Sequence, residues 1–190
     1  MFLSIIIPVY NTKPHFLEEC LESLSVIDSK HYSFETIIVD DGSKDKETKQ
    51  FLQSKENNFS IIYKENGGVG SARNTGVKNA SGTYIFYLDS DDKLASGFNR
   101  FLDVLKKDNS IDVLYGNLKT FDADIYEVIN KDFNRLTLYF EENVIPNGSF
   151  FKKEAWVAIN GNDESLKILE DYDFWIRIAL KGFNIVHFND

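Results

Sequence analysis

The sequence of 190 residues has one cysteine, three prolines and no apolar run of transmembrane length. The single Cys20 excludes an internal disulfide and is typical of a protein from a reducing compartment. No positively charged partner accompanies Cys20, so we expect it to pack in a helix. Basic residues are also few, because 21 Lys and Arg face 30 Asp and Glu, giving a formal net charge of −9. That charge argues against a nucleic-acid partner, since phosphate backbones bind basic surfaces.

The composition that remains is typical of a folded protein, with 43% hydrophobic and 14% aromatic residues. The length fits one domain with a sizeable core, with or without a subdomain. Apolar, β-favouring runs alternate with helical patterns. Strands are predicted at residues 3–9, 34–39, 59–63, 84–88, 112–115 and 184–188. Helices are predicted after Thr12, which can cap the first of them, and at 45–54, 71–80, 97–107, 153–159 and 170–181. This alternation predicts right-handed crossovers and an α/β fold with a mostly parallel sheet.

Acidic residues follow the strand Tyr84-Ile-Phe-Tyr-Leu88, where Asp89, Asp91 and Asp92 stand within four positions. Like charges at the edge of an apolar core cost free energy unless a cation offsets them. Oxygen ligands of this kind suit Mg²⁺ or Mn²⁺, and ligands of open α/β sheets bind beyond the carboxyl ends of the strands. The alternative is a solvated acidic turn that starts the next helix.

Two further acidic pairs lie at element boundaries: Asp40-Asp41 after the second strand, and Glu170-Asp171 at the start of a late helix. The pair at 40–41 and the cluster at 89–92 both follow strands of one parallel sheet, so we expect them on one rim. A site made of carboxylates suggests metal-assisted chemistry on a phosphorylated substrate, with one carboxylate as base. A rival hypothesis is a phosphatase or phosphotransferase with an aspartyl nucleophile in Asp89-x-Asp91. The Asp92-Lys93 that follows the pair disfavours it.

Four motifs in this order carry a resemblance to a known family. They are Ile6-Ile-Pro-Val-Tyr-Asn11 with Val39-Asp-Asp-Gly-Ser43; Asn66-Gly-Gly68 with Ala72-Arg-Asn-Thr-Gly76; Leu88-Asp-Ser-Asp-Asp92; and Glu170-Asp-Tyr-Asp173. In these segments the sequence resembles the family-2 glycosyltransferases, inverting sugar-nucleotide enzymes. The resemblance implies the GT-A fold, a Rossmann-like, mostly parallel central sheet with helices on both faces.

The resemblance implies a donor site for a nucleotide sugar. Its residues would be Pro8, Val9, Tyr10, Asn11, Asp40, Asp41, Gly68, Arg73, Asp89 and Ser90. The segment 8–11 would line the base, and Asp41, with Asp40 as the alternative, would accept a base N–H. For Asp41 the structural alternative is a helix N-cap or Asx turn. Arg73 would face the diphosphate and supply positive charge; its alternative is a surface arginine on a helix.

The resemblance also implies a metal and a base. Asp91 is the expected ligand of Mn²⁺ or Mg²⁺, with Asp89 supporting it directly or through the ribose. Asp171 is the expected general base, because the first turn of a helix favours an ionised carboxylate. The same position is common for acidic residues that only stabilise a helix. Asp173 and Arg177 are predicted to form a structural pair.

The implied reaction transfers one sugar from a nucleotide-diphosphate sugar to a hydroxyl of a glycan or lipid-linked acceptor, and the resemblance favours uridine as the base of the nucleotide. The expected setting is cell-surface polysaccharide synthesis, in the cytoplasm or peripherally on the inner face of the membrane through segments outside this chain. Residues 1–115 would form the nucleotide-sugar half and 116–190 the acceptor half of one catalytic domain, which could be a C-terminally truncated piece. A non-catalytic sugar-nucleotide-binding domain is the alternative.

Two departures from the family pattern bear on the acceptor. The segment Asn160-Gly-Asn-Asp-Glu164 lacks the aromatic residue of the family's Gly-Gly-Phe-Asp-Glu. The chain also has no Gln-x-x-Arg-Trp motif of processive members, which favours transfer of one sugar per encounter. Between residues 116 and 144 the periodicity breaks down, and we expect this region to shape the pocket of a second ligand.

Overall fold

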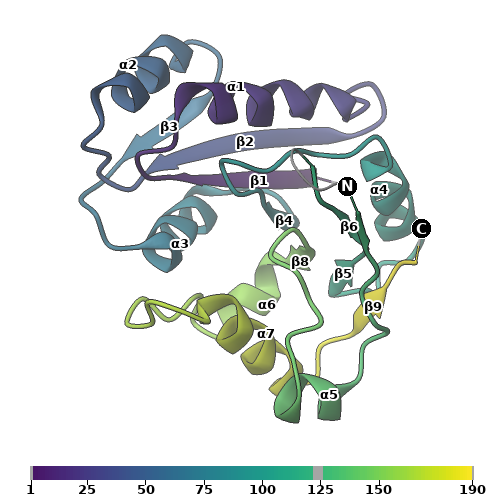
Figure 1. The fold of residues 1–190 in the computed structure, drawn as a ribbon. Helices are drawn as coiled ribbons and strands as arrows, with labels where there is room; N and C mark the ends of the chain where they lie inside the picture. Colours follow the sequence, from purple (N-terminus) through teal and green to yellow (C-terminus); the bar gives the residue numbers. More distant parts are fainter. Residues whose placement is uncertain (1, 122–125, 190) are drawn as a thin grey trace.

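The computed structural model describes residues 2–121 and 126–189. Figure 1 shows a central sheet with helices on both faces. The elements of the described residues are β1 (Phe2–Val9), α1 (Pro14–Ser23), a 3₁₀ turn (Leu24–Val26), β2 (Ser33–Asp40), α2 (Lys46–Lys55), β3 (Ser60–Tyr63), α3 (Val69–Asn79), β4 (Tyr84–Tyr87), α4 (Phe98–Lys107), β5 (Val113–Tyr115), β6 (Leu118–Lys119), β7 (Glu127–Val128), α5 (Arg135–Phe140), β8 (Phe150–Lys152), α6 (Lys153–Ala158), α7 (Glu170–Leu180) and β9 (Ile185–His187).

The described residues form a seven-stranded sheet in the order β3-β2-β1-β4-β8-β5-β9, beside a two-stranded sheet of β6 and β7. Strand β1 pairs in parallel with β2 and with β4, and β5 pairs in parallel with β9. Only β8 in the larger sheet runs antiparallel to its neighbours. The predicted mostly parallel α/β sheet is therefore confirmed.

Alternating side chains of β1 build the two layers of the core. Leu3, Ile5 and Ile7 pack in the cluster that holds the buried faces of α1 and α4. Ile6, between them, packs in the other cluster, with residues of α3, α6 and α7. Because successive side chains of a strand point to opposite faces, one strand fills both layers. The burial of β1 on both faces fixes its carboxyl end in the interior of the sheet, between β2 and β4.

Strand β8 was not expected from the sequence. Residues 148–151 were interpreted only as the segment that precedes the helix predicted at 153–159. The strand inserts between β4 and β5, pairing Phe151 with Ile85 on one side and with Val113 on the other. Its three residues carry no alternation that a pattern could reveal, and helix α6 begins at the next residue, Lys153. The burial of Phe150 and Phe151 supplies the reason for the insertion.

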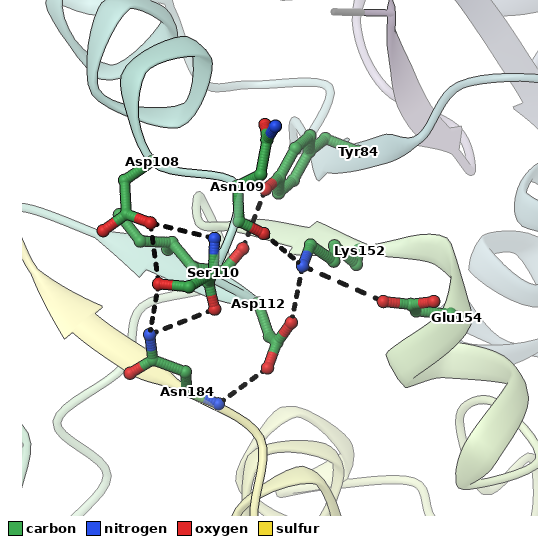
Figure 2. Close-up of polar contacts among 9 residues, drawn as sticks. Tyr84, Asp108, Asn109, Ser110, Asp112, Lys152, Glu154 and Asn184 are labelled. Carbon is green, nitrogen blue, oxygen red and sulfur yellow. Dashed lines mark hydrogen bonds and ion pairs between the residues drawn. The ribbon is translucent and has the colours of Figure 1, made fainter.

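A polar cluster holds the same part of the sheet at the opposite end from the acidic rim (Figure 2). Lys152 of β8 forms an ion pair with Asp112 at 2.8 Å and donates to the carbonyl of Asn109. The other oxygen of Asp112 accepts the backbone N–H of Asn184, just before β9. Tyr84 of β4 donates to the carbonyl of Ile111. Strands distant in sequence are thus joined by side chains as well as by the ladder.

The expected cap of the first helix is wrong. Lys13, not Thr12, occupies the N-cap position of α1, and no side chain caps that end. The hydroxyl of Thr12 instead shares a 2.7 Å hydrogen bond with that of Ser90, and its carbonyl accepts the hydroxyl of Thr48. The competing partner is a residue 78 positions away, which local pattern cannot reveal.

Cys20 lies in α1 and is fully buried, as expected from the sequence. Burial, together with the nearby charges of Asp92, Asp89 and Asp91, raises the pKa of its thiol to about 12. Such a thiol stays protonated at neutral pH and serves as packing against the acidic turn. Within the described part of the chain, no helix has the length and apolar character that a bilayer span requires.

Two glycines of α3 give a stability prediction with a built-in control. A Cβ at Gly76 would lie 2.2 Å from Cγ2 of Ile6 on β1, whereas one at Gly70 would meet its nearest atom, on Asn162, at 3.5 Å. We expect Gly76→Ala to cost about 1–3 kcal/mol of unfolding free energy through overpacking. Gly70→Ala should be neutral or stabilise by up to about 1 kcal/mol through helix propensity. Urea denaturation of both variants checks this, and equal effects would contradict it.

Candidate active site

The acidic rim lies where β2, β1 and β4 end side by side. These strands are adjacent and parallel, so the residues after β2 and after β4 flank the end of β1. The predicted common rim of the two acidic clusters is confirmed. After β4, the backbone N–H of Asp92 bonds to the carbonyl of Asp89 at 2.9 Å and closes a turn. That turn carries Asp89, Asp91 and Asp92 at the strand's carboxyl end.

Asp41 holds the glycine loop that precedes α3. Its carboxylate accepts the backbone N–H groups of Gly67 at 3.0 Å and Gly68 at 2.7 Å, and pairs with Lys64 at 2.6 Å. Asp41 is therefore neither an N-cap nor an Asx turn. The N-cap of α2 is Asp45, and Asp40 makes the local turn contact by accepting the N–H of Ser43.

A cavity of about 320 Å³ opens beside this loop. It is lined by Pro8, Val9, Tyr10, Asp41, Asn66, Gly68, Val69 and Ala72. Five of these residues, from three separate segments of the sequence, were predicted to contact the donor, and the fold brings them to one pocket. The volume lies at the lower end of the range of small-molecule sites, and the walls combine apolar groups with one buried carboxylate.

The other five predicted donor residues do not line this cavity: Asn11, Asp40, Arg73, Asp89 and Ser90. Two of these, Asn11 and Ser90, make contacts within the neighbouring turns. Asn11, with φ of 54°, donates its backbone N–H to Ser43, and its side-chain oxygen accepts the N–H groups of Lys44 and Asp45. Ser90 is buried against Thr12 through the hydroxyl contact described above. Both residues fasten the turns that surround the cavity.

Arg73 joins the two halves of the candidate site. Its side chain is 2% exposed, with Nη2 on Asp89 at 2.8 Å and Nη1 on Glu170 at 3.0 Å. The guanidinium also lies 5.2 Å from the ring centre of Tyr87. Burial opposes its charge, but the two carboxylates outweigh burial and raise the pKa of Arg73. The alternative of a surface arginine is therefore wrong. The guanidinium of Arg73 is paired with one carboxylate from each of two acidic motifs, Asp89 and Glu170.

Asn74, the next residue, fixes the segment 160–164 that departs from the family pattern. Its amide donates to the carbonyl of Asn162 at 2.9 Å and to Glu164 at 2.8 Å, and its oxygen accepts the N–H of Asn162. The bonds from Asn74 and Ser71 hold the pKa of Glu164 below its usual value. The hydroxyl of Tyr87 donates to the side chain of Asn162. The segment is thus anchored without the missing aromatic.

Helix α7 presents Asp171 in its first turn. One oxygen of Asp171 accepts the amide of Asn143 at 3.1 Å, and the side chain is half-buried. Leu169, just before the helix, has a left-handed φ of 59°, which a non-glycine residue rarely adopts. The predicted pair of Asp173 and Arg177 is confirmed at 2.7 Å, and Trp175 is fully buried in the core.

The metal prediction depends on Asp89, Asp91 and Asp92. One oxygen of Asp89 is on Arg73, and Asp91 is exposed with no hydrogen bond to other described residues. Loss of water around the carboxyl of Asp92, with the charges of Asp89 and Asp91, raises its pKa to about 6. A cation would relieve that repulsion. Within residues 2–121 and 126–189, no three acidic, histidine or cysteine side chains converge as a complete metal site. The protein oxygens therefore fit a hard cation whose remaining ligands come from elsewhere.

Sequence reasoning missed three residues of this site: Asn143, Asn74 and Lys167. Nζ of Lys167 lies 3.8 Å from where a Cβ on Gly68 would be, at the glycine loop. Lys167 is exposed and has no ion-pair partner among the described residues. Its only sequence signal is a positive charge shortly before the Glu170-Asp171 pair.

Comparisons with known proteins bear on the family and the fold of this chain. The sequence model of the family described as Glycosyl transferase family 2 matches residues 4–160. The Bacillus subtilis glycosyltransferase EpsJ is 38% identical over 114 residues, which cover 59% of this chain and 32% of EpsJ. Among solved structures, S. aureus TarS 1–349 in complex with UDP aligns with a TM-score of 0.80 and 24% identity, over all of this chain and 58% of that one. The Pyrobaculum calidifontis mannosyltransferase PcManGT, in complex with GDP-Man and Mn²⁺, aligns with a TM-score of 0.69 and 18% identity, over 99% of this chain and 55% of its own.

Proposed function

Since the chain belongs to glycosyl transferase family 2, we propose that it transfers one sugar from a nucleotide-diphosphate sugar to a hydroxyl of a glycan or lipid-linked acceptor. The fold is the α/β GT-A fold that the resemblance implied. The observation that carries the proposal is the rim itself, where a cavity of about 320 Å³ and a cluster of carboxylates lie at the carboxyl ends of three adjacent strands. The part of the chain that matches EpsJ covers 32% of the length of that protein.

The donor's base fits the 320 Å³ cavity, between the backbone of Pro8 to Tyr10 and the glycine loop. Asp41 already accepts three donors, but a carboxylate has about four lone-pair sites, so it can accept one N–H of the base as well. We propose uridine, supported by the UDP complex of TarS. The guanine donor of PcManGT is the alternative that the experiment below includes.

Asp91 and Asp89 would hold Mn²⁺ or Mg²⁺ between the protein and the diphosphate. When bound, the ion would neutralise the negative charge of the leaving nucleoside diphosphate. The protein's own contribution is to orient the two carboxylates. The ion pair with Arg73 fixes the carboxylate of Asp89, and the turn after β4 leaves Asp91 exposed toward the donor.

Asp171 is the proposed general base. Its carboxylate takes the proton from the acceptor hydroxyl as that oxygen bonds to the anomeric carbon. The bond from this carbon to the phosphate oxygen breaks on the opposite face, and its electron pair stays with the nucleoside diphosphate. Inversion needs one base and a stabilised leaving group, as in inverting glycosidases. Asn143 orients one oxygen of Asp171 and leaves the other for the acceptor.

Because Arg73 is committed to two carboxylates, we propose that Lys167 supplies positive charge to the donor phosphates. Lys167→Ala should raise the KM for the donor about fivefold and leave kcat unchanged, since an exposed charge contact contributes about 1 kcal/mol. Lys49→Ala, on the exposed side of α2, is the control and should change neither. Steady-state kinetics check this. A fall in kcat at constant KM would contradict a donor-binding role.

Thermal unfolding with a panel of UDP-, GDP- and ADP-sugars, with and without Mn²⁺, tests the function. A ligand that binds only the folded state raises its stability by mass action, by about 2.7 kcal/mol at a concentration of 100 Kd. We expect the largest rise with a UDP-sugar and Mn²⁺ together. No rise with any nucleotide sugar in the presence of Mn²⁺ would overturn the proposal. A separate product assay on the same nucleotide sugars tests the rival hypothesis. Release of inorganic phosphate without a glycoside product would favour the phosphotransferase.

A further inference from the structure

A second cavity, of about 550 Å³, lies on the other side of the acidic turn from the donor cavity. The donor cavity uses the ends of β1 and β2, whereas this one uses Phe86 and Leu88 at the end of β4, and Phe150 of β8. In the sheet order β2-β1-β4-β8, the turn after β4 separates the two. Asp91 and Asp92 form part of its wall, so the cavity opens beside the proposed metal ligand Asp91.

The inner wall of this cavity is aromatic. Phe86, Phe98 and Phe150 are each at least 94% buried and contact one another with ring centres 4.7–5.1 Å apart. Phe101 adds a fourth ring, 5.9 Å from Phe150. Packed rings of this kind offer apolar surface and no hydrogen-bond partner for a sugar hydroxyl.

The outer wall comes from the region where sequence periodicity was lost. Leu118 of β6 and Val128 of β7 line the cavity, and Leu118 is 42% exposed. Lys119 stands on the same strand, so charges of both signs, from Lys119, Asp91 and Asp92, surround an apolar floor. The residues 122–125 between these strands lie outside the described part of the chain.

Two glycines, Gly116 and Gly148, line the cavity, and one of them has room for a side chain. A Cβ at Gly116 would lie 2.3 Å from the ring of Phe101, so a side chain there would force that ring to move. A Cβ at Gly148 would meet its nearest atom, on the ring of Phe86, at an ordinary 3.6 Å. A larger side chain at Gly148 can therefore project into the cavity from its edge.

We propose that this cavity binds the apolar chain of an aliphatic acceptor, and so selects a lipid-type acceptor over a free glycan. The inference rests on the proposed function, because the donor occupies the cavity across the turn and leaves this one to the acceptor. An aliphatic group buried against the four phenylalanines would hold its attached hydroxyl-bearing head at the mouth, beside Asp91. Protein interiors are close-packed, so an apolar cavity of this size next to a reaction centre suits a ligand of matching chemistry.

Binding of methyl, hexyl and octyl β-D-glucopyranoside below their micelle concentrations, measured by calorimetry without donor, tests the cavity alone. We expect affinity to rise about fourfold per methylene, the equivalent of about 0.8 kcal/mol for each buried CH₂. Gly148→Leu should reduce this dependence to less than twofold per methylene, while Gly148→Ala should keep it. If Gly148→Leu fails to fold, Leu118→Trp narrows the cavity from the opposite wall and should have the same effect.

Equal affinity for the methyl and octyl glycosides would overturn the proposal. So would a chain-length dependence that the filling variants leave unchanged, because the chains would then bind elsewhere. Binding of UDP with Mn²⁺ is measured on the same samples. If the wild type binds no UDP in the presence of Mn²⁺ but still shows the chain-length dependence, the result counts against the proposed function and not against the cavity.

Discussion

Replacement of Asp171 by Asn is expected to lower the turnover of sugar transfer by about 10²–10⁴-fold, the contribution of a positioned general base. The amide keeps the size of the carboxylate and can still contact Asn143, but it cannot take the acceptor proton. Donor affinity should change by less than about twofold, because Asp171 does not line the donor cavity. The measurement is steady-state kinetics of transfer, with UDP binding determined separately.

Asp173→Asn is the matched control, the same substitution two residues later in α7. Asp173 pairs with Arg177, and its loss should reduce stability slightly without a comparable fall in kcat. If Asp171→Asn transfers sugar as fast as the wild type, Asp171 is not the base. If both variants lose turnover equally, the effect belongs to the helix and not to one carboxylate.

Arg73→Ala is expected to cost about 3–5 kcal/mol of unfolding free energy, as when one partner of a buried ion pair is removed. Asp89 and Glu170 would lose their shared partner, and the side chain that fills the space beneath Tyr87 would be gone. For a chain of this size the loss corresponds to a fall in Tm of about 6–20 °C. Urea denaturation and thermal unfolding measure it.

Arg73→Lys separates charge from geometry, because a lysine ammonium is a point charge that cannot reach two carboxylates with a planar fork. We expect it to recover part of the stability but to weaken Mn²⁺ binding in the presence of UDP, since Asp89 loses its fixed orientation. Lys78→Ala, an exposed cation on the same helix, should stay within about 0.5 kcal/mol of the wild type. A loss below about 1 kcal/mol in Arg73→Ala would contradict the linking role.

The strands and their acidic ends could be predicted because their signals are local. Apolar runs identified β1, β2 and β4, carboxylates follow β2 and β4, and parallel pairing then predicted the shared rim. The pocket of Pro8, Val9, Tyr10, Asp41 and Gly68 follows from the same logic, since each residue lies at the carboxyl end of a strand, just beyond it, or at the start of a helix.

The partners of the charged residues could not be predicted in the same way. Arg73 bonds to residues 16 and 97 positions away, and the sequence reveals its charge but not which acids it meets. The expected diphosphate contact of Arg73 remains a prediction, and its two bonds leave less of its charge for a ligand. Strand β8 was missed by the sequence analysis for a related reason. Its three residues adopt the strand conformation because they pair with neighbouring strands on both sides, and their own sequence pattern does not indicate a strand.

Calorimetric titration of UDP into the wild type and Asp91→Asn, with and without Mn²⁺, tests the central claim most directly. In the wild type we predict that Mn²⁺ tightens UDP binding at least about tenfold, equivalent to about 1.4 kcal/mol. In Asp91→Asn this gain should disappear while the metal-independent affinity stays. Two results would contradict the claim that the carboxylates of the rim hold a diphosphate through a metal ion. One is a UDP affinity of the wild type that does not change with Mn²⁺, and the other is an equal Mn²⁺-dependent gain in UDP affinity in Asp91→Asn.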